Sequence, residues 1–445
     1  MKQILLLGAG RSSVYLIDYL IEQAPSLNWR ITIADLQTHH LQKQVEQFPF
    51  VLLVDFNIHI QEQLTVQVGQ ADLIISLLPA AFHLVVAQTC LDLGKHFLTA
   101  SYVSPEIKAL HEAAQQKGLL FLMEAGLDPG MDHMSALAAI AKIKHKGGEL
   151  LAFKSYTGGL VAPESDTNPW HYKISWNPRN VVLAGQGTAR FLQNKAPKYI
   201  PYPQLFRRTE KIEIIGLGEL EGYANRDSLS YREAYGLESI ATLIRGTLRW
   251  PGFCAAWRQL IQLGLTDDSY TLLHSGGRTY AQWLESYLPA SSENLPLLTR
   301  LANYLNLPEN SAEMEALQFL GLLENELINL ENVTPAQILE QRLIQKLPLQ
   351  PTDKDLVVMQ HEFKYKLGNE NRRLKSALVV IGQNATYTAM AKTVGLPLGM
   401  AARFILQNKN FLTGVHIPTH PEIYEPILAE LKKLGILFTE QEELL

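Results

Sequence analysis

The stretch KQILLLGAGRSS, residues 2–13, decides the fold of the amino-terminal part of the chain. An apolar run ends at Gly8 and Gly10, and small polar residues follow. This pattern is typical of a buried strand that turns sharply into a helix, whose first N–H groups have no partner within the helix. Gly8 permits the tight turn, and Gly10 permits the backbone to approach a pyrophosphate. Ser13 stands at the third glycine position of this dinucleotide fingerprint.

The same pattern of an apolar strand followed by a helix continues to about residue 130. Five further apolar runs are typical of strands buried on both faces, namely RITIAD, FVLLVDF, DLIISLLP, HFLTASY and LLFLMEA. Amphipathic segments between these runs indicate helices. Strand and helix in alternation predict an α/β fold with a Rossmann-type doubly wound parallel sheet.

Asp35 ends the second of these runs and bears on the choice of cofactor. A carboxylate at this position accepts hydrogen bonds from ribose hydroxyls and repels a 2′-phosphate, so we expect NAD, with NADP as the alternative. Asp35 could instead cap the helical segment that follows it. Arg11 and Ser12, just inside the glycine-rich turn, are further expected contacts, although Arg11 also fits a solvated position.

Ligands of open parallel sheets bind outside the carboxyl ends of the strands. Three such ends carry polar residues or glycines, in SLLP, TASYVSP and EAGLDPG. The expected cofactor contacts from these ends are Leu77, Thr99, Ala100, Gly126 and Leu127. Pro129 biases Asp128 toward an extended backbone, so Asp128 is either a ligand contact or a cap of the next helix.

Beyond residue 150 the pattern changes. The segments ELLAFKSYTGGL, YKISWNP and KIEIIGLGELEGYAN resemble strands, four amphipathic helical segments occupy 270–346, and KDLVVMQHEFKYKLGNENRRLKSALVVIG indicates a hairpin that turns at GNEN. We therefore expect a second, mixed-sheet α+β domain with a helical insertion. The expected limits are 1–130 plus about 385–445 for the dinucleotide domain, 131–268 plus about 353–384 for the substrate and dimerisation domain, and 269–352 for the insertion.

Composition excludes several classes of partner. A net charge of −5 and a pI near 6.2 give no nucleic-acid footprint. We find no apolar stretch near the roughly 18 residues that span a bilayer, so we expect no membrane partner and a cytoplasmic protein. Cys90 and Cys254 stand far apart and outside metal-ligand spacings, and His133 and His171 are isolated. We expect neither a disulfide nor a metal site.

Three arginines stand in unusual surroundings. EGYANRDSLSYREAYG and LIRGTLRWPGF place Arg226, Arg245 and Arg249 among glycine, asparagine and aromatic residues. Arginine suits bidentate binding of carboxylates, but most arginines lie on solvated surfaces, so composition alone leaves their role open.

These stretches also resemble a known family. SYVSP, GLDPGMDH, GGLVAPESDTNPWHYKISW, YANRDS and RGTLRWPGF, in this order, resemble the glutamate-forming saccharopine dehydrogenases, also called saccharopine reductases. The resemblance runs through the first 257 residues, weakens across the helical segment, and resumes at KDLVVMQHEF and YTAMAKTVGLP.

The resemblance implies a small-molecule substrate, saccharopine, which NAD(P)⁺ oxidises reversibly to an imine that water opens to 2-aminoadipate semialdehyde and glutamate. It implies a homodimer, and Trp176 on the nicotinamide side. The expected substrate contacts are Ser101, Tyr102, Asp128, Arg226, Arg245, Thr247, Leu248 and Arg249. Tyr102 and Asp128 are also the candidate catalytic acid and base. The fungal biosynthetic members are NADP-linked, with a basic sequence where this chain has ADLQ, which favours NAD and leaves the direction open.

Two other functions fit the same fold. One is an oxidoreductase acting on a polyamine-type imine, which would need acidic residues where this chain has its arginines. The other is a non-catalytic NAD-binding sensor, against which the intact SYVSP, GLDPG and NRDS motifs argue.

Overall fold

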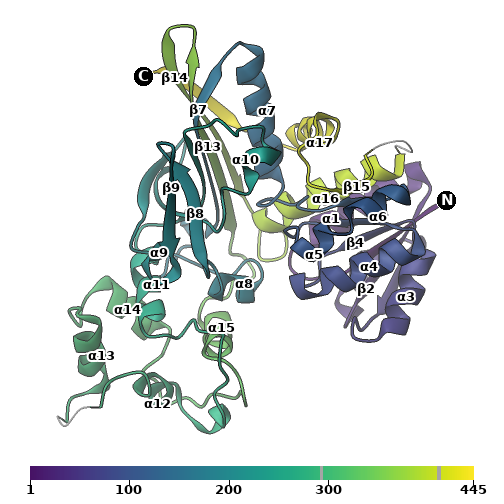
Figure 1. Ribbon diagram of the computed structural model, residues 1–445. Helices are drawn as coiled ribbons and strands as arrows, with labels where there is room; N and C mark the ends of the chain where they lie inside the picture. The colour runs from purple at the N-terminus through teal and green to yellow at the C-terminus, as the bar shows by residue number, and fades with distance from the viewer. Residues whose placement is uncertain (291–293, 408–411) are drawn as a thin grey trace. The chain divides into compact units, whose positions relative to one another are not determined.

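The computed structural model describes residues 1–290, 294–407 and 412–445, and the chain divides into two compact units (Figure 1). Unit 1 comprises residues 1–149 and 386–438, and unit 2 comprises residues 150–385 and 439–445. The expected limits differ at two boundaries, and the predicted insertion domain 269–352 lies within unit 2. Residues 131–149 belong to unit 1, where helix α7 (Met131–His145) packs against helix α17, and residues 439–445 belong to unit 2.

Unit 1 is built on a seven-stranded parallel sheet, which confirms the predicted Rossmann-type fold. Its strand order is β15-β6-β5-β4-β1-β2-β3. The strands are β1 (Lys2–Leu7), β2 (Trp29–Asp35), β3 (Val51–Asp55), β4 (Leu73–Ser76), β5 (His96–Thr99), β6 (Leu120–Leu122) and β15 (Gly414–His416). The first six coincide with the six predicted apolar runs. β15 was not predicted, because three residues are too short to show a period.

Helices pack against this sheet and against one another. They are α1 (Val14–Leu27), α2 (Gln42–Val45), α3 (Gln61–Gln70), α4 (His83–Leu93), α5 (Pro105–Lys108), α6 (His111–Gln116), α7, α16 (Ala389–Gln407) and α17 (Pro421–Lys433). α16 corrects our expectation that no segment is long and apolar enough to cross a membrane, since by length and composition it is. Most of α16 is buried within unit 1, and at Gly395 a β-carbon would lie 2.8 Å from the backbone nitrogen of Leu16 in α1, so it is a core helix.

Unit 2 is built on a nine-stranded mixed sheet, which confirms the predicted class of the second domain. The main path is β10-β11-β12-β7-β13-β14-β16, and β8 and β9 pair beside β12. The strands are β7 (Glu149–Val161), β8 (Thr188–Gln193), β9 (Ala196–Pro201), β10 (Glu210–Ile214), β11 (Gly218–Ala224), β12 (Thr242–Arg249), β13 (Asp355–Leu367), β14 (Glu370–Ile381) and β16 (Thr439–Leu444). The predicted hairpin is β13–β14, with its turn at GNEN.

Two features of this sheet differ from the sequence analysis. YKISWNP forms no strand, and only Ile174 makes an isolated bridge, to Pro348. β12 was not predicted as a strand, although it pairs in parallel with β7 and antiparallel with β11. Its sequence, TLIRGTLR, does not show the usual alternation of apolar and polar residues, because here Arg245 and Arg249 are buried too.

Unit 2 also contains the helices α8 (Pro178–Val182), α9 (Tyr202–Leu205), α10 (Tyr231–Ala234), α11 (Phe253–Gln262), α12 (Tyr280–Glu285), α13 (Leu297–Leu305), α14 (Ala312–Phe319) and α15 (Pro335–Lys346). The last four match the predicted helical segments, but they do not form a separate domain. Trp283, Leu301 and Leu339 belong to the same continuous apolar core as Trp170 and Trp257. A short helix can bury only one stripe of its surface, so these helices complete their core against the rest of unit 2.

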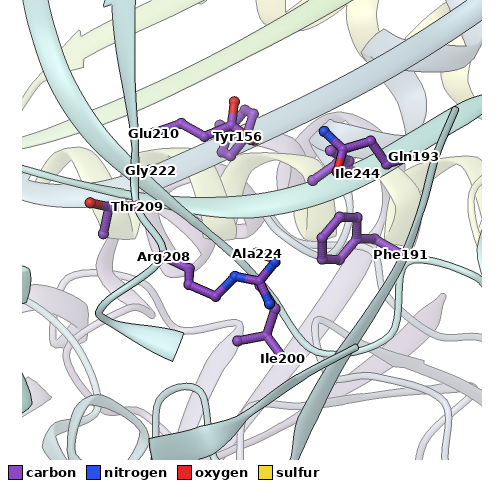
Figure 2. A pocket seen from close by; sticks show the side chains of 10 residues that line it. All are labelled: Tyr156, Phe191, Gln193, Ile200, Arg208, Thr209, Glu210, Gly222, Ala224 and Ile244. Atoms are coloured by element: carbon purple, nitrogen blue, oxygen red, sulfur yellow. The ribbon is translucent and has the colours of Figure 1, made fainter. Parts of the chain in front are cut away.

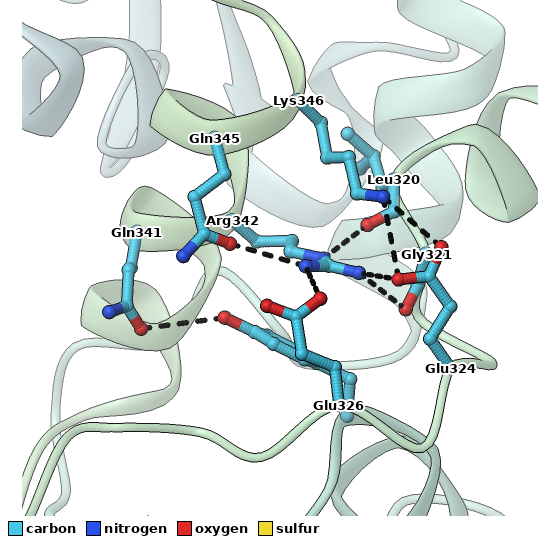
Figure 3. A network of polar contacts seen from close by, with 9 residues as sticks. Leu320, Gly321, Glu324, Glu326, Gln341, Arg342, Gln345 and Lys346 are labelled. Atoms are coloured by element: carbon cyan, nitrogen blue, oxygen red, sulfur yellow. Dashed lines mark hydrogen bonds and ion pairs between the residues drawn. The ribbon is translucent and has the colours of Figure 1, made fainter.

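Arg342 of α15 holds the helical part together (Figure 3). Its guanidinium is buried, donates hydrogen bonds to the carbonyls of Leu320 (2.5 Å) and Gly321 (3.1 Å), and pairs with Glu324 and Glu326. It also lies 4.1 Å from the centre of the Tyr280 ring. One side chain therefore connects α12, α15 and the segment after α14.

Candidate active site

The glycine-rich turn has the geometry that a pyrophosphate site requires. Gly8 has a φ of +90°, and a β-carbon there would lie 3.0 Å from the carbonyl carbon of Leu77. At Gly10 a β-carbon would meet no atom within 4 Å, so the backbone is open to a ligand. The Ser13 hydroxyl donates to the carbonyl of Gly10 (2.8 Å) and does not cap α1. The Ser13 side chain therefore does not occupy the amino terminus of α1, where the helix dipole favours an anion.

Asp35 is not a helix cap. Its Oδ2 accepts a hydrogen bond from the N–H of Ala9 (2.5 Å), which ties the glycine-rich turn to the end of β2. Asp55 stands beside it in register at the end of β3 and accepts from the backbone and hydroxyl of Thr38 (3.0 and 2.8 Å). These hydrogen bonds lower the pKa of Asp55. Two carboxylates therefore stand at the neighbouring ends of β2 and β3.

The other predicted strand-end residues lie along the same edge of the sheet. Thr99 uses its hydroxyl internally, donating to the carbonyl of Ser76 (2.8 Å). A β-carbon on Gly126 would lie 2.7 Å from the β-carbon of Ala100, so these two backbones must stay close. Leu127 is buried, whereas Arg11 is exposed and Ser12 is half-buried.

The loop 126–130 brings the two candidate catalytic side chains together. The Tyr102 hydroxyl lies 3.5 Å from Oδ1 of Asp128, and both residues are half-buried. Asp128 does not cap α7, because Gly130 is the N-cap residue and its N–H donates to Oδ1 of Asp132 (2.6 Å). Gly130 has a φ of +147° and no room for a β-carbon, which would lie 2.1 Å from the carbonyl oxygen of Gly126.

A buried acidic and basic pair lies under this loop, and the sequence analysis missed it. Oε2 of Glu124 is 2.8 Å from Nε2 of His133, and their side chains are 5% and 0% exposed. His133 was regarded as isolated, because nine residues separate it from Glu124 and no periodic pattern joins them. One signal was present in the sequence. A carboxylate directly follows LLFLM, a run with no other polar residue.

A second buried histidine supports Ser101. Nε2 of His83, the first residue of α4, lies 2.7 Å from the Ser101 hydroxyl. Burial lowers the pKa of His83 to about 4, so its ring is neutral at pH 7. Among the described residues its Nδ1 has no hydrogen-bond partner.

In unit 2, strand β12 carries three of the predicted substrate residues on one face. Arg245, Thr247 and Arg249 alternate along the strand, so their side chains point to the same side. The side chain of Leu248 points to the other side and lies fully buried in the apolar core, so its predicted substrate contact would involve the backbone.

Arg249 is a buried cation with an unused donor. It is 3% exposed, and the rings of Phe253, Tyr172 and Tyr223 lie 5.1, 5.5 and 5.9 Å from its guanidinium carbon. One nitrogen donates to the carbonyl of Leu248 (2.9 Å), whereas Nε has no partner in the part of the chain that the structure describes. Burial lowers the pKa of Arg249, but the nearby Tyr223, Tyr172 and Glu221 raise it by more. The pKa therefore lies above its usual value, and the guanidinium stays charged.

The other predicted residues of unit 2 lie near β12. Arg245 is buried, and its guanidinium lies 4.2 Å from the centre of the Tyr231 ring. The carbonyl of Arg245 accepts from the N–H of Asn225 (2.8 Å), the residue before the exposed Arg226. Trp176 donates from its ring nitrogen to the hydroxyl of Tyr172 (3.0 Å), which connects it to the surroundings of Arg249.

The opposite face of β11 and β12 borders a separate cavity of about 300 Å³ (Figure 2). Its walls include Ile244, Phe191 and the ring of Tyr156, which lies where a β-carbon on Gly246 would be 2.2 Å away. Its lining contains none of the predicted site residues. Of its charged residues, Glu210 pairs with Lys154 of β7 (2.7 Å).

Two family models together match almost the whole chain. Residues 4–122 match the saccharopine dehydrogenase NADP binding domain, and residues 126–436 match the saccharopine dehydrogenase C-terminal domain. The chain belongs to the saccharopine dehydrogenase family. This membership confirms the resemblance that the sequence motifs indicated.

Individual members of the family are similar over the full chain. This chain is 34% identical to the mitochondrial alpha-aminoadipic semialdehyde synthase of Bos taurus over 99% of the chain's own length. It spans about half of that protein, 48% of its length. It is 30% identical to the NADP(+)-dependent, L-glutamate-forming saccharopine dehydrogenase of Pyricularia oryzae, over 98% of each chain. The apo saccharopine dehydrogenase (L-Glu forming) of Saccharomyces cerevisiae matches with a TM-score of 0.87 and 29% identity over 100% of each chain.

Proposed function

We propose that the protein is an L-glutamate-forming saccharopine dehydrogenase, an NAD(P)-dependent oxidoreductase of lysine metabolism. Family membership supports the class of reaction. The observation that carries the proposal is Arg249, a charged guanidinium 3% exposed with an unused Nε donor. The aromatic rings, the carbonyl of Leu248 and Glu221 stabilise this charge only in part, and a substrate carboxylate would be a further partner.

Saccharopine carries three carboxylates and two amines, and the candidate residues of each unit offer groups that would bind them. Arg226, Arg245 and Arg249 would bind carboxylates, and Thr247 would contribute a hydroxyl. Ser101, Tyr102 and Asp128 would contact the substrate near the amine that joins its two halves. A polyamine-type imine lacks carboxylates, so three arginines would repel it.

When bound, a nicotinamide cofactor would supply the hydride acceptor that oxidation at Cε of the lysine part of saccharopine requires. The bond between Cε and the secondary nitrogen becomes an imine, and one proton leaves the nitrogen. Water then adds to Cε, and the carbon–nitrogen bond breaks to give 2-aminoadipate semialdehyde and glutamate. Asp128 and Tyr102 would take up and return protons at the nitrogen and at the added water.

We infer that NAD is preferred over NADP. Gly8, Gly10 and the amino terminus of α1 would hold the pyrophosphate, and Asp35 would accept from the adenosine ribose. The carboxylates of Asp35 and Asp55 support this preference, whereas the domain family is described as NADP binding and the Pyricularia relative as NADP(+)-dependent. Trp176 beside the nicotinamide, a homodimer and a cytoplasmic location stay predictions.

One assay tests the function and the cofactor together. The purified protein is given saccharopine with NAD⁺ or with NADP⁺, and the reduced nicotinamide is followed by its absorbance. We expect reduction with both, faster with NAD⁺. Faster reduction with NADP⁺ would contradict only the cofactor preference. Tight NADH binding without turnover of saccharopine would favour the sensor function and contradict the enzyme assignment.

A further inference from the structure

Glu124 holds the chain on both sides of Tyr102. Its backbone N–H donates to the carbonyl of Ser101 (3.1 Å), and its side-chain Oε1 accepts from the N–H of Val103 (3.0 Å). One residue thus fixes the peptide groups that precede and follow Tyr102. The direction in which the Tyr102 side chain leaves the backbone depends on these two groups.

The other carboxylate oxygen of Glu124 connects this clamp to the Asp128 loop. Oε2 lies 2.8 Å from Nε2 of His133, which stands in the first turn of α7. The same turn fixes the loop, because the N–H of Asp132 donates to the carbonyl of Leu127 (3.0 Å). The Glu124–His133 pair therefore joins the segment that carries Tyr102 to the helix that holds Asp128.

Glu124 adopts a backbone conformation that its type does not favour. Its φ is +56°, in the left-handed region where glycine or asparagine is usual. Its carboxylate is also 5% exposed, at a place where a charged group loses its hydration. Both features oppose a glutamate here, and such strain persists at functional sites when the surroundings hold it in place.

We propose that Glu124 is a positioning residue for the Tyr102–Asp128 pair, with His133 as its anchor. The proposal rests on the proposed function, in which this pair moves protons. The Tyr102 hydroxyl and the Asp128 carboxylate are 3.5 Å apart, at the outer limit of a hydrogen bond, so a small shift of either segment decides whether they engage.

A double-mutant cycle tests the proposal. Glu124→Ala should lower kcat/KM for saccharopine by about 100-fold, the usual effect of a misplaced reacting group, with an unchanged dissociation constant for NADH. Glu124→Gln keeps an acceptor for the N–H of Val103 and should recover about tenfold of that loss. In a Tyr102→Phe background Glu124→Ala should cost little more, because the positioned hydroxyl is already absent. Equal losses in both backgrounds would overturn the proposal, as would full activity of Glu124→Ala.

The matched control is Glu430→Gln. Glu430 of α17 also belongs to unit 1 and pairs with Arg403 of α16. The substitution therefore removes an ion pair of the same unit that has no part in the site. This variant should leave kcat/KM within about twofold. A loss as large as that of Glu124→Ala would show that any such pair has this effect, which would overturn the specific role of Glu124.

Amide hydrogen exchange gives a readout that does not depend on activity. The N–H of Val103 should exchange at least about tenfold faster in Glu124→Ala and in His133→Ala than in the wild type, because its acceptor is lost or displaced. Unchanged protection in both variants would overturn the clamp even if saccharopine is turned over. Wild-type protein that fails to oxidise saccharopine would contradict the proposed function, while the exchange result would still decide the clamp. If Glu124→Ala does not fold, Glu124→Gln and His133→Ala carry both measurements.

Discussion

In unit 1 the candidate functional side chains stand on loops that follow strands, whereas in unit 2 Arg245, Thr247 and Arg249 stand within strand β12 itself. The loops of unit 1 are held by backbone hydrogen bonds and by carboxylates, such as those of Asp35 and Glu124. The arginines of β12 are held by aromatic rings and by strand pairing. The two units thus hold opposite charges by different means.

The difference teaches how each kind of site depends on its surroundings. A loop carboxylate that accepts backbone N–H bonds is stabilised by neighbours close in the sequence or at adjacent strand ends. A buried arginine in a strand has lost its hydration, and the face of an aromatic ring replaces only part of it. The stability of the buried arginine charges should therefore depend on a bound ligand more than that of the loop carboxylates does.

The largest effect should come from Arg249→Met. Losing the partner of a bound carboxylate costs about 2–5 kcal/mol in the binding of the transition state, and methionine fills the space without charge. We expect a corresponding fall in kcat/KM for saccharopine and an unchanged dissociation constant for NADH. Arg208→Met is the control, because Arg208 is an exposed arginine of the same unit that lines the separate cavity. Near-normal turnover by Arg249→Met would contradict the role of this buried arginine in binding the substrate.

Asp128→Asn tests the loop side of the same comparison. The amide keeps the size of the side chain but cannot take up a proton, so kcat should fall by about 100-fold, at the lower end for a lost general base. Steady-state kinetics with saccharopine and NAD⁺ measure this effect. A rise in KM with kcat unchanged would mean that Asp128 only binds the substrate.

His83 is a buried group that is neutral at pH 7, in contrast to the buried and charged Arg249. Burial holds its pKa at about 4 in the folded state, below the usual value of 6.5. Between these two pH values the unfolded state binds a proton that the folded state does not, so stability should fall by up to about 1.4 kcal/mol per pH unit as the pH decreases. Above pH 6.5 the histidine should have no such effect.

Amide protection factors in β5 and β6, measured at pH 7 and pH 5, check this slope. His83→Gln should lose less protection between the two pH values than the wild type, because glutamine does not titrate. Equal losses would show that His83 is not the group responsible for acid sensitivity of this sheet.

The smallest effect should come from Asp35→Ala. Removing one carboxylate beside the adenosine ribose should narrow the preference for NAD over NADP by about tenfold, or about 1.4 kcal/mol. The ratio of kcat/KM values for the two cofactors measures it. Asp18→Ala is a control on the same unit, since Asp18 lies within α1 and accepts from Gln44. An unchanged ratio for Asp35→Ala would leave Asp35 as a structural partner of Ala9 alone.

The sequence by itself determined those features that depend on near neighbours. The six apolar runs gave the first six strands, because a strand buried on both faces is continuous in hydrophobicity. Gly8 and Gly10 marked the turn. Gly8 has a φ of +90° and no room for a β-carbon beside Leu77, whereas Gly10 leaves the backbone open to a ligand. The motifs that contain Arg226, Arg245 and Arg249 identified the family, although their physical surroundings were not visible.

Only the tertiary structure decided the features that depend on distant partners. It paired β12 with β7 and β11, joined the helical segment to the core of unit 2, and brought His133 to Glu124. It also assigned Asp35 to the N–H of Ala9 and left Leu248 facing the core. Local patterns report which surface a residue prefers, but burial, ion pairing and hydrogen bonding depend on which segments the fold brings together.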